Sequence, residues 1–123
     1  MLTEGIQHTS TVTVTEQNTA LALGSGDLPV FATPALVALM ENAAMKTVAS
    51  LLPEGSTTVG GFIETSHLAP SAIGKTIQAT ATLTEVKGKK LSFNIEAFEG
   101  EKLVGKAAHI RFIVDREKFM NSL

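Results

Sequence analysis

Three side chains supply a hydroxyl, a carboxylate and an imidazole within the first 67 residues: Thr33, Glu41 and His67. An imidazole beside a carboxylate and a hydroxyl is a recurring arrangement in acyl transfer, where one group attacks or activates water and another carries the proton. The chain has no cysteine, which excludes thiol nucleophiles and thiolate-bound metals. These residue types therefore indicate oxygen and imidazole chemistry, provided that the fold brings them together.

The three histidines, His8, His67 and His109, show no local spacing typical of metal ligands. We therefore predict no metal site and no cofactor. The formal net charge is −2 and no basic run is longer than Lys89-Lys90, so neither nucleic acid nor an anionic membrane is expected as a partner. No stretch reaches the ~18 apolar residues of a membrane span, so we expect a soluble, cytoplasmic protein.

Glu41 is the most informative candidate, because it lies within an apolar helical pattern. Its stripe contains Val37, Ala44 and Val48, and no residue three or four positions away is a cation. This predicts a buried carboxylate without a cation beside it, an environment typical of general bases and nucleophiles. The alternative is a helix face that reaches solvent through a gap in the sheet.

His67 and Thr33 each have a structural explanation beside the catalytic one. His67 ends a strand pattern and shares its odd-numbered face with Val59 and Ile63, so alone it is typical of a hydrogen-bonded strand end. Thr33 precedes Pro34, which is typical of a helix start, and its hydroxyl is predicted to cap the helix. A helix start also favours negative charge that develops on a substrate oxygen.

Two further positions stand out in the strand patterns. Gly60-Gly61 interrupts a strand, which indicates either a bulge or the close approach of another backbone or a ligand. His109 and Arg111 share one face of the last strand, opposite Ala108. That face is interpreted either as an exposed polar surface or as a contact with phosphate or substrate, and both interpretations stay open.

The elements that position these side chains follow from the same patterns. Residues 35–52 predict one long helix, because Pro34 suits its first turn, Pro53 ends it, and Glu41 and Lys46 are the only charged residues within it. A helix that is apolar nearly all round is predicted to be buried.

Strand patterns fill most of the remaining chain. They cover residues 5–14, 57–68, 76–84, 91–97 and 103–114, with glycine turns between the last three. One buried helix against about five antiparallel strands is an α+β layout in which the sheet must curl around the helix. We therefore predict the hotdog fold, with cystatin-like and ferredoxin-like layouts as alternatives, in a single domain over residues 1–123.

Several motifs resemble those of a known family. They are TPALVALMENAA at residues 33–44, VGG at 59–61 and HLAP at 67–70. Together they resemble the fluoroacetyl-CoA thioesterase group of hotdog proteins, over most of the chain from residue 5 to about 116. The resemblance implies an acyl-CoA thioesterase for a short acyl group, working as a homodimer or higher homo-oligomer, with coenzyme A present only as part of the substrate.

By resemblance, Thr33, Glu41 and His67 form the catalytic set. Glu41 either attacks the thioester carbonyl or activates water, and both roles stay open. His67 shuttles a proton or acts as the electrophilic partner, and Thr33 hydrogen-bonds within the set. The implied substrate-binding residues are Gly60, Gly61 and Arg111.

Residues 24–30, just before the helix, depart from the family pattern because they lack the expected aromatic lid residues. This predicts a permissive acyl pocket. The alternative function is a non-catalytic acyl-CoA-binding protein, whereas a hotdog hydratase is disfavoured because no aspartate stands in a D-x-x-x-x-H arrangement. Thr33 and Glu41 are about 12 Å apart along a helix, so we also predict an active site formed between two chains.

Overall fold

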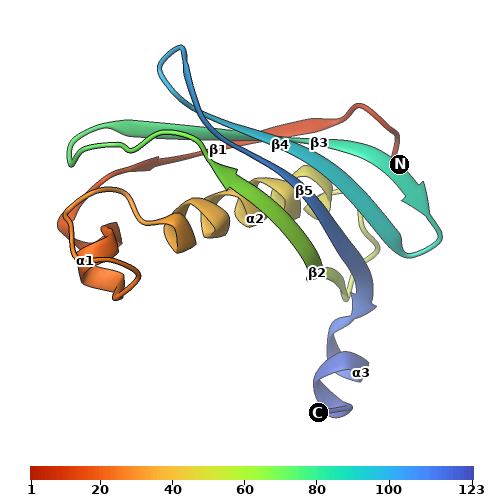
Figure 1. Ribbon diagram of the computed structural model, residues 1–123. Coiled ribbons are helices and arrows are strands. Elements are labelled where there is room, and N and C mark those ends of the chain that lie inside the picture. Colours follow the sequence, from red (N-terminus) through yellow and green to blue (C-terminus); the bar gives the residue numbers. More distant parts are fainter.

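Helix α2 (Thr33–Ala49) is the central element of the computed structural model, which describes residues 1–123 (Figure 1). It begins two residues earlier and ends three residues earlier than predicted. Pro34 fits the first turn, where no intrahelical partner for its nitrogen is needed. Ser50 is the C-cap of the helix. Pro53 disfavours a helical conformation of Leu52 just before it, so the helix does not extend to residue 52.

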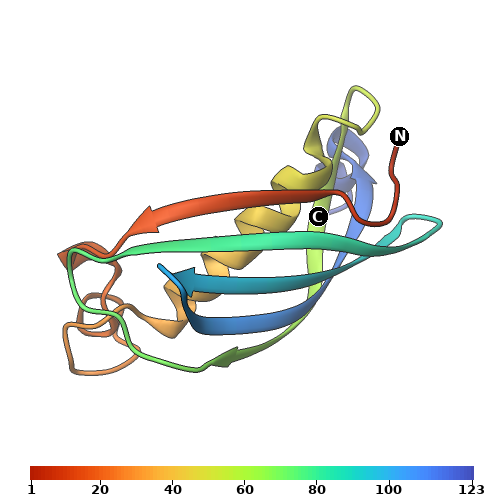
Figure 2. The ribbon, with the colours of Figure 1, turned by 90° about the horizontal axis from the view of Figure 1, so that it is seen from above.

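A five-stranded antiparallel sheet curls around this helix (Figures 1 and 2). Its strands are β1 (Gln7–Thr13), β2 (Ser56–His67), β3 (Thr76–Lys87), β4 (Lys90–Glu99) and β5 (Lys102–Asp115), in the order β1-β3-β4-β5-β2. The turns between β3 and β4 and between β4 and β5 contain Gly88 and Gly100 at positive φ, which glycine adopts without steric cost. The predicted α+β arrangement of sheet and buried helix is confirmed.

The inner face of the sheet and α2 form one hydrophobic core. On β3 and β4 buried and more exposed residues alternate, as the predicted half-buried strands require. The helix contributes its buried apolar residues Leu36, Leu39, Met40, Ala43, Ala44 and Val48. Burial of this surface is the main favourable contribution to folding, and it fixes which residues of α2 face the sheet.

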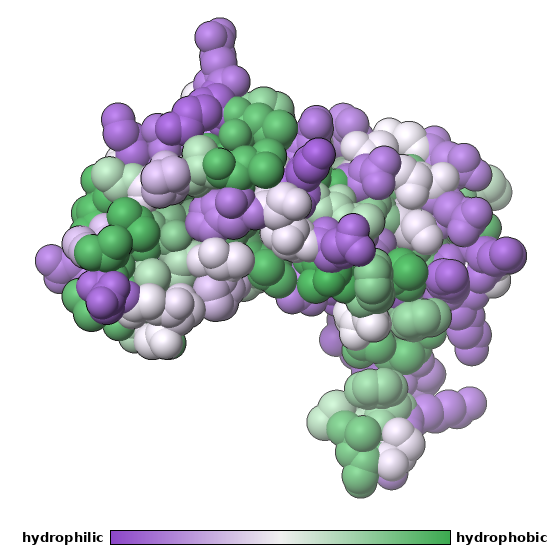
Figure 3. Space-filling view, viewed as in Figure 1, coloured by the Kyte–Doolittle hydropathy of each residue, from purple (hydrophilic) through white to green (hydrophobic).

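Short elements cover the end of the molecule where α2 begins. They are η1 (Glu16–Asn18) and α1 (Ala20–Leu23), and residues 24–32 connect them to α2. Apolar side chains gather on the surface over α1, where Leu21, Leu23 and Leu28 are exposed (Figure 3). Helix α3 (Arg116–Asn121) extends from the end of β5 (Figure 1). The helices are all too short or too polar to cross a membrane.

Candidate active site

Thr33 and His67 meet where α2 begins and β2 ends. The Thr33 hydroxyl lies 2.7 Å from Nδ1 of His67 and forms a hydrogen bond with it. The predicted capping role of Thr33 is wrong, because the helix starts at Thr33 itself and Ala32 occupies the cap position without a side-chain hydrogen bond. The Thr33 hydroxyl therefore does not cap the helix and instead hydrogen-bonds to the imidazole of His67.

The surroundings of His67 favour a neutral imidazole. The rings of Phe31 and His67 pack in a T-shaped arrangement, with their centres 6.5 Å apart and their planes at 81°. Burial lowers the pKa of His67 below 6.5, and the Ala69 backbone opposes this only in part. Nδ1 is bonded to Thr33, whereas Nε2 is buried and has no hydrogen-bond partner in the chain.

A cavity of about 330 Å³ adjoins this pair. It is lined by Ala20, Ser25, Val30, Phe31, Thr33, His67, Leu68, Ala69 and Pro70. Largely apolar walls with two hydroxyls, those of Ser25 and Thr33, and one imidazole are typical of a site for a small acyl group. A larger hollow of about 700 Å³ is lined mainly by polar side chains of the strands, and none of the predicted site residues lines it.

Glu41 lies two turns further along α2 and does have a cationic partner. Its Oε2 is 3.7 Å from Nη1 of Arg111, and the Glu41 side chain is 40% exposed. The prediction of a carboxylate without a cation is therefore wrong. The partner comes from β5, so inspection of the helical neighbours of Glu41 could not reveal it.

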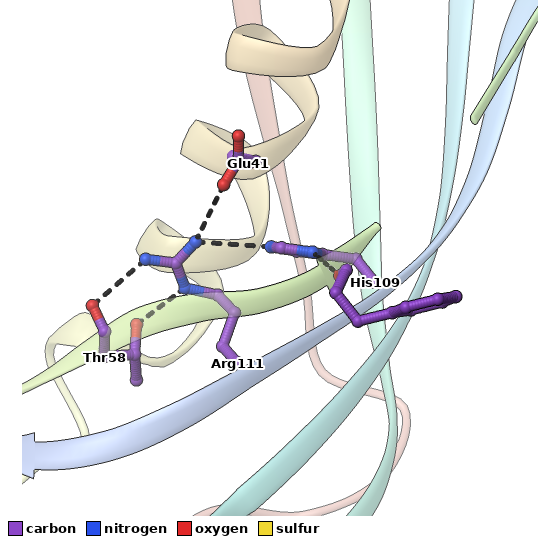
Figure 4. A network of polar contacts seen from close by, with 5 residues as sticks. Glu41, Thr58, His109 and Arg111 are labelled. Atoms are coloured by element: carbon purple, nitrogen blue, oxygen red, sulfur yellow. Dashed lines mark hydrogen bonds and ion pairs between the residues drawn. The ribbon is translucent and has the colours of Figure 1, made fainter. Parts of the chain in front are cut away.

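Arg111 contacts Thr58 of β2 and His109 of its own strand, β5 (Figure 4). Its Nε donates to Thr58 Oγ1 at 2.8 Å, its Nη2 donates to the Thr58 carbonyl at 3.0 Å, and its Nη1 lies 3.2 Å from Nε2 of His109. Both His109 and Arg111 are buried. The interpretation of their face as an exposed polar surface is wrong, because this face of β5 turns toward α2.

The two adjacent glycines of β2 explain how that polar cluster fits beneath the helix. A Cβ on Gly60 would lie 2.8 Å from Glu41 Oε2, and one on Gly61 would lie 2.5 Å from the Phe112 ring. The register against β5 also shifts between Gly60 and Phe62. The bulge therefore occurs, and the groups that approach the two glycines closely are side chains rather than another backbone.

The same bulge reverses which residues of β2 face inward. Before it the buried residue is Thr58, whereas after it Ile63, Thr65 and His67 are the less exposed positions. The predicted common face of His67 and Val59 is therefore wrong. Thr58 and Gly60, which lies beside Glu41, share the inward face of β2 with His67 at the end of the strand.

One chain thus contains two separate polar groups. Thr33 and His67 are bonded to each other, and Glu41, His109 and Arg111 converge over Gly60. The positions of Thr33 and Glu41 on α2 separate the two groups by about 12 Å along the helix axis. Sequence reasoning did not single out Thr58. The second group was signalled by Glu41, by the two adjacent glycines, and by the shared strand face of His109 and Arg111.

The free energy of unfolding should fall as the pH drops below 6.5. Burial lowers the pKa of both His67 and His109, so the unfolded chain binds more protons than the folded chain in this range. This stabilising contribution is complete above the unfolded pKa and is lost as the pH falls through the lowered values. Urea unfolding at a series of pH values measures the slope. His67→Gln should make the slope shallower, and an unchanged slope would contradict the prediction.

Comparisons with known proteins agree on one family. The family model of FlK, the fluoroacetyl-CoA-specific thioesterase, matches residues 14–117. The fluoroacetyl-CoA thioesterase of Streptantibioticus cattleyicolor is 37% identical over 90 residues, which are 73% of this chain and 65% of that protein. The chain thus spans just under two thirds of the length of this relative.

Solved structures extend the likeness to the whole fold. A crystal structure of a point mutant of FlK superposes with a TM-score of 0.92 at 30% identity, covering 99% of this chain and 95% of that one. A hypothetical protein of Thermus thermophilus, described as a thioesterase superfamily member, gives a TM-score of 0.90 at 27% identity, covering 98% and 90%. The fold is that of the hotdog thioesterases, as predicted.

The chain belongs to the FlK family of fluoroacetyl-CoA-specific thioesterases. The predicted resemblance is thereby confirmed. The predicted class of enzyme, a thioester hydrolase, is also the class of these relatives.

Proposed function

We propose that this protein hydrolyses the thioester of a short-chain acyl-coenzyme A, releasing the free acid and CoA. The observation that carries the proposal is the 2.7 Å bond between Thr33 and His67 at the wall of an apolar cavity, in a chain of this family. Water supplies the new oxygen of the acid, the carbon–sulfur bond breaks, and the CoA sulfur leaves as a thiolate that takes up a proton.

Glu41 is the proposed centre of the reaction. As a nucleophile it would form an anhydride with the acyl group, which water then hydrolyses; as a general base it would deprotonate the attacking water. Either role uses the carboxylate form, and the guanidinium of Arg111 lies 3.7 Å from it. His67 is the proposed proton carrier, and Thr33 holds its ring through Nδ1.

The proposed contacts with the substrate use the bulge of β2. The backbone amide of Gly60 would bind the carbonyl oxygen and Gly61 would adjoin it, as the resemblance implies. The Arg111 side chain is only 8% exposed, and its Nε and Nη2 donate hydrogen bonds to Thr58. We therefore propose that Arg111 acts on the reaction indirectly, by positioning the Glu41 carboxylate. The cytoplasmic location stays a prediction.

A second chain is proposed to complete the site. Three observations support this: the two polar groups lie apart in one chain, Glu41 is partly open to solvent, and β2 is an edge strand of twelve residues beside it. A long unpaired edge is a common place for another chain to attach. We therefore propose a homodimer or higher oligomer in which Glu41 of one chain meets Thr33 and His67 of its partner.

The acyl pocket should accept several short acyl groups. Residues 24–30 contain no aromatic side chain, and Leu28 there is exposed. Phe31 is buried and fixed against His67, with its amide donating to the Ser71 carbonyl, so it cannot serve as a moving lid. Phe62 is half exposed and does not line the cavity.

Thiol release from fluoroacetyl-, acetyl-, propionyl- and butyryl-CoA tests both the activity and this selectivity. We expect turnover of all four, with fluoroacetyl-CoA favoured over acetyl-CoA only by its greater intrinsic reactivity. Binding of acyl-CoA without thiol release would contradict the proposed activity and support the alternative of a non-catalytic acyl-CoA-binding protein. A preference for fluoroacetyl-CoA of ~10⁴-fold or more, far above what a fitted pocket supplies per methylene, would contradict the permissive pocket.

A further inference from the structure

His109, a buried histidine that the proposed chemistry does not use, carries a further inference. It stands on the face of β5 toward α2, with its Nε2 beside the guanidinium of Arg111 (Figure 4). The centre of the Phe93 ring of β4 lies 6.2 Å from the centre of the imidazole. The charged groups that face it are Arg111 from β5 and Glu41 from α2. From β2 it meets the carbonyl of Phe62.

Two hydrogen bonds determine where the imidazole of His109 carries its proton. Nδ1 lies 2.6 Å from the Phe62 carbonyl oxygen, which can only accept, so Nδ1 bears the hydrogen. Nε2 lies 3.2 Å from Arg111 Nη1, which can only donate, so Nε2 presents a lone pair. Burial holds the pKa of His109 below 6.5, opposed by the Phe62 carbonyl; Arg111 adds to the lowering and Glu41 opposes it. The ring is therefore neutral.

The guanidinium of Arg111 has one nitrogen left for the two groups above it. Nε and Nη2 both donate to Thr58, so Nη1 is the nitrogen that faces His109 and Glu41. Nη1 is shared between His109 Nε2 at 3.2 Å and Glu41 Oε2 at 3.7 Å. A separation of 3.7 Å is too long for a hydrogen bond. The carboxylate thus has a nearby positive charge without being locked into a short ion pair.

We propose that His109 is a positioning residue for Glu41: its Nε2 lone pair holds Arg111 Nη1 and keeps the guanidinium from closing onto the carboxylate. This inference rests on the proposed role of Glu41 in the reaction. A short ion pair would share the lone pairs of the carboxylate with Arg111 and weaken it as a base or nucleophile. Gly60 leaves the room for this arrangement, since a Cβ there would lie 2.8 Å from Glu41 Oε2 and 3.4 Å from His109 Cε1.

Two substitutions of His109 separate positioning from packing. His109→Leu fills the space but offers Arg111 no acceptor, and kcat should fall ~10- to 100-fold, the range expected when a reacting group is misplaced by up to about 1 Å. KM should change little, because Glu41 acts in the chemical step. His109→Gln carries an amide oxygen near the position of Nε2 and should restore most of kcat. His8→Leu, on β1, is the matched control and should leave kcat unchanged.

Nitrogen NMR of the wild-type imidazoles at neutral pH gives a readout that requires neither turnover nor a stable variant. We expect a protonated Nδ1 and an unprotonated Nε2 on His109. A proton on Nε2, or a His109→Leu variant as active as the His8→Leu control, would overturn the inference, and so would a His109→Gln variant as impaired as His109→Leu. An inactive wild type would instead overturn the proposed function, and the two failures are thereby distinguishable.

Discussion

Glu41→Gln should lower turnover by at least ~10²-fold while the fold remains intact. The amide is nearly isosteric with the carboxylate but can neither attack the thioester nor accept a proton from water, and loss of positioned acid–base catalysis has an effect of this size. The change also removes the negative charge opposite Arg111. Steady-state thiol release with a short acyl-CoA measures the loss. An active Glu41→Gln enzyme would refute the proposed mechanism in both its forms.

The stability of the same variant distinguishes two pictures of Glu41. Sequence alone predicts a slight gain in stability, because an unpaired buried carboxylate costs folding free energy. The structure reverses that expectation: Glu41 is 40% exposed and has Arg111 at 3.7 Å, so we expect a loss of no more than ~1 kcal/mol, as for other partly exposed pairs. Arg111 keeps its bonds to Thr58 and His109 in the variant. Urea unfolding decides this, with Glu64→Gln on the outer side of β2 as the control.

The sequence predicted those features that depend on local patterns. The buried helix follows from its apolar composition, and β3 and β4 follow from strict alternation, so the curled sheet around one helix could be derived without coordinates. The pairing of Thr33 with His67 was also anticipated as part of one constellation, and the structure brings these two together. Each of these features is determined by residues close in sequence or by a motif that the family shares.

The sequence could not predict those features that depend on register. The cation beside Glu41, Arg111, is 70 positions away in the sequence. Whether Arg111 faces the helix depends on which of the two alternating faces of β5 packs against α2. A single extra residue in a strand exchanges the inner and outer faces beyond it. Because the register shifts after Gly60 in β2, the prediction that Val59 shares a face with His67 is wrong. The two glycines had indicated an irregularity at this point of the strand.

Mixed oligomers of Thr33→Ala and Glu41→Gln chains should regain activity that neither parent has. If Glu41 of one chain works with Thr33 and His67 of its partner, a mixed dimer contains one site with both defects and one site with none. Purified mixed dimers, isolated through two different affinity tags, should then show about half of the wild-type turnover per dimer, because one of two equivalent sites is intact.

The hydrogen bond between Thr33 and His67 within one chain provides the matched control for that experiment. Because these two residues come from the same chain, dimers that combine Thr33→Ala with His67→Ala carry one defect in every site and should stay inactive. Restored activity in this control, or none in the mixture of Thr33→Ala with Glu41→Gln, would contradict a site shared in this way. An active monomer in sedimentation would do the same, since Glu41 would then have to reach the Thr33 and His67 pair along its own helix, across about 12 Å.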